Sequence, residues 1–304
     1  MMIPVLGFVL GIFVLIKTSN WAVDLSVKFS EITGLTKTAV GVIIIALMTS
    51  LPELTISITS SISNANHIMF GTLFGSTVAD ILLVFGIGLV YGIKTSKENF
   101  KQVKWIMIIT SVLLIYGLFY GFNINLGLLS VIIFLVLSKK LLARKTKNDS
   151  KKWDDIINGL IILFKLTFAI AIILLSAELV TLTTVEISNM FGLSQTLIAG
   201  TIIAITCVLP ELCVTISSVR KREYDIGIGN IFGSCFVNIA FILGLGIIIA
   251  PVIIGLNEVL LIVSLFISYM IVFSFLYTKT LDRFAGLILL LFYVLYILGI
   301  GVAG

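Results

Sequence analysis

The sequence predicts an all-α membrane protein in which ten transmembrane helices form two inverted five-helix repeats. Three observations support this fold class. The 304 residues are 59% hydrophobic and only 12% charged, with a mean hydropathy of +1.22, whereas soluble domains are nearer half apolar and a quarter charged. Apolar stretches long enough to cross a bilayer core of about 30 Å recur along the whole chain. One block of sequence also occurs twice, as in proteins built from repeats.

Ten apolar segments account for most of the chain. In the first half they are Met2–Ile32, Thr38–Ser61, Ile68–Ile93, Val103–Tyr120 and Leu126–Leu142. In the second half they are Ile156–Ser188, Thr196–Val219, Ile226–Ile249, Glu258–Tyr277 and Ala285–Val302. These runs are too long and continuous for the alternating strands of a membrane barrel. We therefore divide the chain into a first repeat at residues 1–143, a linker at 144–155 and a second, inverted repeat at 156–304.

Basic residues predict how the chain is oriented in a cell membrane. The loops fall into two sets when they are numbered in chain order. The even loops, at 64–67, 121–125, 189–193 and 251–257, contain no Lys or Arg, while the odd loops carry nearly all of them. Because cytoplasmic loops are enriched in Lys and Arg, the odd loops, including the central basic loop Lys139–Asp155, are predicted to be cytoplasmic. Both termini of this multi-pass protein are then outside.

The internal repeat begins where Gly34-Leu35 matches Gly192-Leu193. The register holds without a gap as far as residues 86–88 and 244–246, with about 20 identities in roughly 55 aligned positions. Each half contains an odd number of predicted helices, so the second copy must enter the membrane upside down relative to the first. Inverted repeats of this kind are typical of secondary transporters, which bind their substrate near the bilayer midplane where the repeats meet.

The strongest chemical signal is Thr49-Ser50-Leu51-Pro52-Glu53, which recurs as Cys207-Val208-Leu209-Pro210-Glu211. Each copy lies near the middle of an apolar helix, where a carboxylate is costly and marks a functional site. Proline cannot donate to the carbonyl four residues before it. Pro52 should therefore free the carbonyl of Met48, and Pro210 that of Thr206. Carbonyl oxygen beside carboxylate oxygen is the ligand set that Ca²⁺ requires.

A second motif, Gly71-Thr72-Leu73-Phe74-Gly75-Ser76 followed by Asp80, recurs as Gly229–Ser234 followed by Asn238. The serine and the residue four positions later share one helix face in each copy. The glycines allow a neighbouring helix to approach closely. Oxygen ligands from two helices of each repeat would then converge on one pseudo-symmetric site.

These motifs resemble the repeats of the Ca²⁺/cation antiporter superfamily, and most closely the prokaryotic Na⁺/Ca²⁺ exchangers with their Thr-Ser-x-Pro-Glu and Gly-Asn-x-x-Gly-Ser motifs. The resemblance covers both repeats and implies that Glu53 and Glu211 bridge the Ca²⁺ and also serve Na⁺. The first and sixth helices would slide as a gating bundle past a rigid core. The predicted metal-binding set, which adds Thr206, is Glu53, Glu211, Thr49, Ser50, Ser76, Asp80, Cys207, Ser234, Asn238, Ala46, Ala204 and Thr206.

Within this set, the resemblance assigns hydroxyl or carbonyl oxygens to Thr49 and Ser50, and flanking carbonyls to Ala46 and Ala204. Ser76 and Ser234 would supply hydroxyls, and Asp80 and Asn238 would be central polar ligands. The chain departs from the family pattern at Cys207-Val208, where two hydroxyls are lost and only the backbone carbonyl of Cys207 remains for Ca²⁺. A Na⁺ site that depends on a hydroxyl at position 208 is weakened. Thr206 has a hydroxyl, but it points about 100° around the helix.

The expected function is therefore Ca²⁺/Na⁺ exchange by alternating access, with both ions as substrates and the lipid bilayer as surroundings. An H⁺-coupled antiporter stays open, because three buried carboxylates could take up protons instead of Na⁺. A cation channel also stays open, although no selectivity-filter-like segment is evident. A purely structural alternative is that the prolines only kink helices and that Gly71–Gly75 is a packing motif. Enzyme motifs, a cofactor, nucleic-acid binding and an obligatory protein partner are not indicated.

Overall fold

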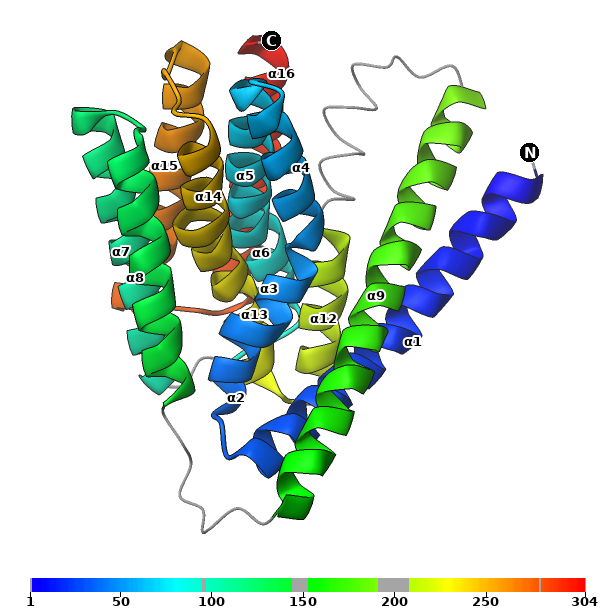
Figure 1. The fold of residues 1–304 in the computed structure, drawn as a ribbon. Coiled ribbons are helices and arrows are strands. Elements are labelled where there is room, and N and C mark those ends of the chain that lie inside the picture. The colour runs from blue at the N-terminus through cyan, green and yellow to red at the C-terminus, as the bar shows by residue number, and fades with distance from the viewer. Residues whose placement is uncertain (1, 95–96, 144–152, 191–207, 279, 304) are drawn as a thin grey trace.

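The computed structural model describes residues 2–94, 97–143, 153–190, 208–278 and 280–303 (Figure 1). Helices make up nearly all of that part of the chain. Its β-structure is one isolated bridge, in which the Val252 N–H donates to the Phe122 carbonyl at 2.9 Å. The all-α prediction is confirmed for the described residues.

The first half begins with one long helix and continues as shorter segments. Its elements are α1 (Met2–Thr33), α2 (Lys37–Ala39), the π-helical segment η1 (Val40–Ile45), α3 (Ala46–Thr49), α4 (Leu51–Ile62), α5 (Asn66–Ala79), the π-helical segment η2 (Asp80–Val84), α6 (Phe85–Val90), α7 (Lys97–Tyr120) and α8 (Ile124–Leu142). These bounds agree with the predicted segments to within a few residues, except that α7 starts six residues earlier than predicted.

The second half starts with the longest helix of the described chain. Its elements are α9 (Trp153–Met190), α12 (Leu209–Arg220), α13 (Tyr224–Phe236), the π-helical segment η4 (Val237–Ile242), α14 (Leu243–Ile249), α15 (Leu256–Thr278) and α16 (Arg283–Ala303). The predicted span Thr196–Val219 lies only partly within the described residues, as α12.

Seven helical runs of the described chain are long and apolar enough to cross a membrane. Lys37–Thr49 and Leu51–Ile62 would form an eighth span, bent by 51° at the break between them. The apolar part of α16, Arg283–Gly299, falls just short of that length. A multi-pass membrane protein is thus established, whereas the total of ten spans stays a prediction.

The repeat found in the sequence has a matching turn in each copy. Asn64 and Arg222 both have positive φ, 55° and 60°, and they occupy equivalent positions after α4 and α12. In each turn the next residue donates back to a serine carbonyl at 2.8 Å, Ala65 to Ser60 and Glu223 to Ser218. A left-handed conformation is costly for arginine, so its occurrence at the equivalent position indicates that the turn geometry is built into both repeats.

The two copies run in opposite directions through the bundle. In Figure 1, α5 descends into α6, whereas α13 ascends into α14, and α4 and α12 lead away from the centre towards opposite ends. The continuous runs that contain α5 and α13 are mostly buried, unlike the other long helices. The N- and C-termini both lie towards the upper end in Figure 1. This arrangement agrees with an inverted repeat.

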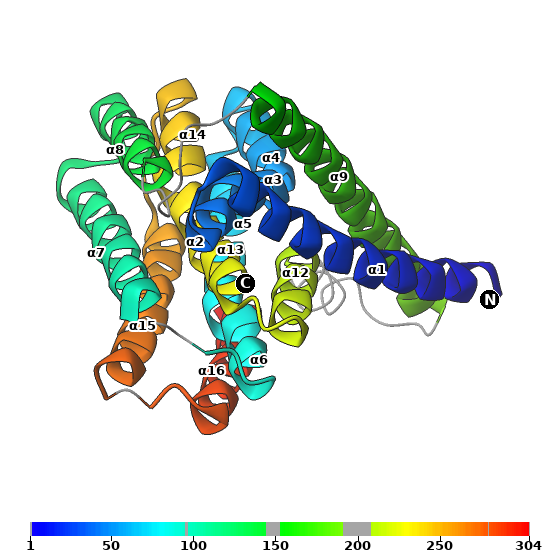
Figure 2. The ribbon, with the colours of Figure 1, turned by 90° about the horizontal axis from the view of Figure 1, so that it is seen from below.

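The outer helices surround this centre unevenly. α1 and α9 pack along each other and lean away from the rest of the bundle, while α7, α8 and α15 lie on the opposite side (Figures 1 and 2). Large apolar side chains are exposed on these outer helices, as expected for surfaces that face lipid. Each of these two helices therefore makes most of its contacts with the other.

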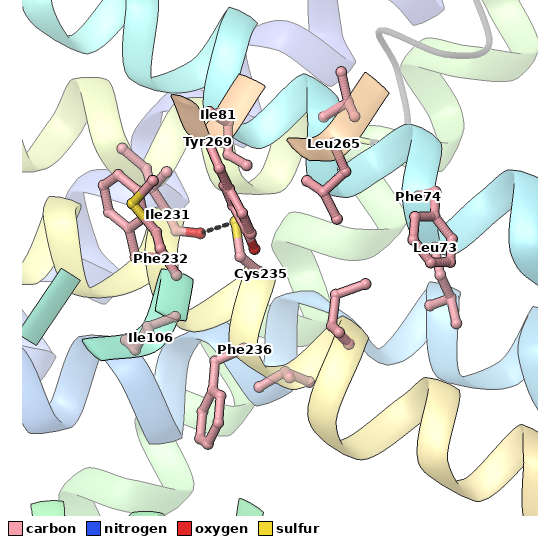
Figure 3. Packing of buried hydrophobic residues seen from close by; sticks show 14 of the residues in the cluster. Leu73, Phe74, Ile81, Ile106, Ile231, Phe232, Cys235, Phe236, Leu265 and Tyr269 are labelled. Carbon is pink, nitrogen blue, oxygen red and sulfur yellow. Dashed lines mark hydrogen bonds between the residues drawn. The ribbon is translucent and has the colours of Figure 1, made fainter. Parts of the chain in front are cut away.

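An apolar cluster joins the buried helices to α7 and α15 (Figure 3). Phe232 and Phe236 of α13 lie in this cluster with Leu265 and Tyr269 of α15. The Tyr269 hydroxyl accepts a hydrogen bond from Thr110 at 3.0 Å. This hydrogen bond satisfies a polar group that would otherwise be costly to bury. The cluster packs tightly beside the polar residues of α13.

Ion pairs connect the turn between α12 and α13 to the first loop and to α1 at the lower end of the bundle (Figure 1). Lys37 lies 2.6 Å from Glu223, and Lys221 lies 2.5 Å from Asp24 of α1. Lys221 also donates to the Asn20 carbonyl at 2.9 Å. The first loop and the turn between α12 and α13 therefore lie at the same end of the molecule, as the distribution of basic residues predicts.

Candidate ion-binding site

The first Pro-Glu motif lies at a break in the helix. α3 ends at Thr49, Ser50 has φ −84° and ψ 14°, and α4 starts at Leu51 with Pro52 in its first turn. Proline is tolerated in a first turn because the N–H that it lacks has no intrahelical partner there. The Ser50 N–H donates to the Ala46 carbonyl at 3.0 Å. Pro52 has no N–H, so the Met48 carbonyl lacks the helical donor four residues later.

The second motif repeats this geometry as far as it is described. Val208 precedes α12 with φ −102° and ψ 10°, close to the values of Ser50, and Pro210 again falls in the first turn. Both helices therefore start in the same way near the middle of the bundle (Figure 1). Ala204, Thr206 and Cys207 lie outside the described residues, so the predictions made for them are not tested.

Three acidic side chains lie in the buried centre: Glu53 and Glu211 follow the two helix breaks, and Asp80 begins η2. Glu53, Asp80 and Glu211 are buried, with 2%, 1% and 1% of their surface exposed. Glu211 interacts electrostatically with both Asp80 and Glu53, and Asp80 also interacts with Glu53. Among the described residues, both carboxylate oxygens of Glu211 and one each of Glu53 and Asp80 have no hydrogen-bond partner. Unpaired carboxylate oxygens in a dry interior need a cation or a proton.

Hydroxyl and amide groups link the two repeats beside these carboxylates. Ser50 Oγ lies 3.3 Å from Ser234 Oγ, and the Ser234 hydroxyl donates to Asp80 Oδ2 at 2.7 Å. Asn238 Nδ2 donates to Ser76 Oγ at 3.2 Å and to Thr77 Oγ1 at 3.4 Å. The four residues predicted on the second motif thus form two pairs across the repeat boundary, Ser234 with Asp80 and Asn238 with Ser76.

Thr49 is buried beside Ser50, but its hydroxyl has other hydrogen-bond partners. Its hydroxyl donates to the Ala46 carbonyl at 3.2 Å and lies 3.5 Å from Asn230 Oδ1. Since Ala46 also accepts from the Ser50 N–H at 3.0 Å, its carbonyl would have to exchange a partner in order to bind an ion. Thr49 also lies near Glu211 of the other repeat.

Asn230 and Thr77 are polar residues that the sequence reasoning missed. Asn230 is fully buried, and its Nδ2 donates to the backbone carbonyl of Glu211 at 3.2 Å. It thereby fixes the first turn of α12 next to the carboxylates. The available signal was an asparagine inside an apolar helix, directly after a glycine of the repeated motif.

The arrangement favours a hard cation that is held by mixed oxygen ligands. Among the described residues, no three His, Cys, Asp or Glu side chains are gathered closely enough to hold a metal by themselves. A cation in this site would therefore also use hydroxyl and backbone oxygens. Ca²⁺ accepts six to eight oxygen ligands in flexible geometry, and a midplane site at helix breaks is the pattern of secondary transporters.

Buried carboxylates at paired helix breaks are typical of proteins that carry cations across a membrane. The family model described as sodium/calcium exchanger protein matches residues 3–139 and 161–302. The chain therefore belongs to the sodium/calcium exchanger family, and so to the Ca²⁺/cation antiporter superfamily. This family is one of transporters and not a class of enzymes.

Curated relatives and solved structures agree with this assignment. The chain is 26% identical to "Sodium/calcium exchanger MaX1" of Methanosarcina acetivorans, over 95% of each chain. It is 27% identical to "Inner membrane protein YrbG" of Escherichia coli, over 80% of this chain and 79% of the other. A structure of the sodium-calcium exchanger NCX_Mj, 23% identical, superposes with a TM-score of 0.83 over 97% of this chain and 98% of the other. That likeness shows the shared fold.

Proposed function

We propose that this protein is a secondary antiporter that exchanges Ca²⁺ for Na⁺ across a cell membrane by alternating access. The observation that carries the proposal is the burial of three carboxylates in the centre, with Glu53 and Glu211 directly after the two helix breaks and Asp80 interacting electrostatically with both. Two carboxylates balance the charge of one Ca²⁺, and the hydroxyls of Ser50 and Ser234 add neutral oxygen ligands. The sodium/calcium exchanger family supports the same pair of substrates.

Alternating access requires one part of the protein to move past another. The pair formed by α1 and α9 is the candidate for that moving part, because the two helices pack mainly on each other and lean away from the centre (Figure 2). α5 and α13, which carry Ser76, Asn230 and Ser234, belong to the buried centre and would stay fixed around the ions.

The coupling ion is tested by flux measurements. Purified protein in proteoliposomes is expected to take up radioactive Ca²⁺ when an outward Na⁺ gradient is imposed, and to show little uptake under a pH gradient without Na⁺. Proton coupling is the competing function, because the unpaired oxygens of the buried carboxylates could hold protons. Equal uptake under the pH gradient would assign H⁺ in place of Na⁺, and uptake that needs no counter-ion gradient would indicate a channel.

The membrane orientation is a second part of the proposal. With both termini outside and the linker at 144–155 inside, a cysteine at Ser150 should react with a membrane-impermeant thiol reagent only from the cytoplasmic side. One at His67, which is exposed in the first turn of α5, should react only from outside. The protein with only its native cysteines is the control. The reverse pattern would overturn the assignment of the odd loops to the cytoplasm.

A further inference from the structure

The turn between α12 and α13 carries a lysine that contacts α1 at two points. Lys221 Nζ lies 2.5 Å from Asp24 Oδ1 and donates to the Asn20 carbonyl at 2.9 Å. Asn20 and Asp24 are four residues apart, so they lie on the same face of α1. Moving α1 along its axis by one turn, about 5.4 Å, would place either Asn20 or Lys28 where Asp24 now lies. Lys221 therefore fixes the position of α1 along α12.

The turn that presents Lys221 is held by contacts of its own. Glu223, two residues later, forms an ion pair with Lys37 at 2.6 Å, and its N–H donates to the Ser218 carbonyl at 2.8 Å. Lys37 starts α2, which continues through η1 and α3 to the first helix break of the ion site. Lys221 thus projects from the part of the molecule that surrounds the ions, whereas both of its acceptors belong to α1, a helix of the candidate moving pair.

The neighbouring contact between α1 and the centre is apolar. Ala22 and Leu25 of α1 lie in one cluster with Val214 of α12. Apolar contact is non-directional, so it allows helices to slide, while the lysine contact must break. A cavity of about 590 Å³ adjoins Asp24 and Lys221, and the Asp24 side chain is 55% exposed. Because solvent screens such an ion pair, it is weak enough to open in every transport cycle.

The repeat has no charged equivalent of this contact at the other end. Residue numbers rise by 158 from the first copy to the second. By this offset, Asp24 corresponds to Leu182, Lys221 to Ser63, Lys37 to Gln195 and Glu223 to Ala65. None of the four counterparts is charged. In Figure 1, α1 lies close to the lower end of the bundle and leans away from it towards the upper end. The two ends therefore differ although the repeat is shared.

We propose that Lys221, bound to Asp24 and to the Asn20 carbonyl, is a lock that holds the ion site closed towards the cytoplasm. This inference rests on the proposed alternating access and on the proposed orientation, which places the lower end in the cytoplasm. Opening towards the cytoplasm requires the lock to break, whereas opening to the outside does not. The lock thus sets the relative populations of the two conformations without touching the transported ions, and the protein without ions favours the outward-open one.

The test removes the lock from either side. Lys221→Ser and Asp24→Leu give the lower end the residues that the repeat has at the upper end. Each is expected to raise the apparent affinity for cytoplasmic Ca²⁺ by about twofold to fivefold, the factor that a partly exposed ion pair contributes to a population. The affinity for external Ca²⁺ should stay the same or fall. Exchange of radioactive for unlabelled Ca²⁺ in inside-out and right-side-out membrane vesicles measures both. An unchanged cytoplasmic affinity, or equal changes on the two sides, would overturn the lock.

Two controls separate the lock from a change of charge. Lys221→Ser and Asp24→Leu alter the local charge in opposite directions, so attraction of Ca²⁺ to the surface cannot explain a shared shift. Arg222→Gln removes a positive charge from an exposed side chain of the same turn and should leave both affinities unchanged. The exchanged pair, Asp24→Lys with Lys221→Asp, should lie closer to the parent than either single reversal. A double variant that does not would contradict an ion-pair lock.

A readout that needs no transport distinguishes failure of the lock from failure of the proposed function. Val214 is fully buried beside α1. With the native cysteines replaced by alanine, Val214→Cys should react slowly with a membrane-impermeant thiol reagent added on the cytoplasmic side. Adding Lys221→Ser should accelerate the reaction about twofold to fivefold, and adding Arg222→Gln should not. Absence of Ca²⁺/Ca²⁺ exchange in the parent would remove the proposed antiport, while equal thiol reaction rates with and without Lys221 would remove the lock alone.

Discussion

Replacing Glu53 or Glu211 with glutamine is expected to abolish Ca²⁺ transport while leaving the protein folded. Both side chains are almost completely buried, at 2% and 1% exposed. Glutamine keeps the shape but removes half of the charge that balances Ca²⁺. Removing one partner of a buried charge pair costs about 3–5 kcal/mol, which is roughly a hundredfold or more in affinity. Uptake of radioactive Ca²⁺ into proteoliposomes under a Na⁺ gradient measures the effect.

A matched control is available on α9. Glu186 is an exposed glutamate, and Glu186→Gln removes the same charge far from the carboxylate cluster, so its transport should stay near normal. Thermal unfolding in detergent should show that Glu53→Gln and Glu211→Gln are at least as stable as the parent, because an unpaired buried charge is itself destabilising. Near-normal exchange by either well-folded glutamine variant would remove these glutamates from the site.

Gly233→Ala is expected to destabilise the protein and to impair transport strongly. A Cβ atom at this position would lie 2.5 Å from Val42 Cα, 2.7 Å from the Val42 carbonyl and 2.9 Å from Ala46 Cβ. These contacts involve backbone of η1 and the start of α3, so α13 would have to move as a unit. Overpacking of this kind costs about 1–3 kcal/mol. The shift would also displace Ser234, which follows Gly233 in the chain, from Ser50.

The equivalent glycine of the first repeat provides the control for this prediction. A Cβ at Gly75 would meet only the Tyr296 hydroxyl, at 3.9 Å, among the described residues. Gly75→Ala should therefore be neutral or stabilising by up to about 1 kcal/mol, the gain in helix propensity from glycine to alanine. Unfolding temperatures of the two variants, measured side by side in detergent, check the difference. Equal stability would mean that α13 and η1 do not approach as closely as described.

The sequence motif Gly-x-x-x-Gly is the same in both repeats, yet its packing differs. A Cβ at Gly229 would lie 2.8 Å from the Thr38 carbonyl, whereas one at Gly71 has no comparable neighbour among the described residues. The prediction of close helix approach is thus supported for Gly229 and Gly233, against η1. The repeat counterpart of η1 lies within residues 191–207, outside the described part of the chain. Identical local sequence could not show which copy is packed against backbone.

Hydropathy and the repeat were sufficient for the class of fold, the ends of most helices and the places of Glu53, Glu211 and Asp80 in buried segments. They are local properties: an apolar run either reaches across a bilayer or does not, and a carboxylate within it is conspicuous whatever surrounds it. The family motif followed from the same short stretches. Pro52 indicated a disturbed helix in this region. The sequence did not show that the break itself falls at Ser50, two residues before the proline.

Contacts between the repeats were decided by tertiary structure. Ser50 meets Ser234, Asn238 donates to Ser76, and Asn230 supports Glu211, and each of these pairs except the last joins residues that are more than half the chain apart. Helix pairing within a membrane depends on close packing and on polar contacts between segments, which no single segment encodes. The residues of the site can therefore be recognised one by one along the chain, while the partner of each hydrogen bond between the two halves is set only when the halves are packed together.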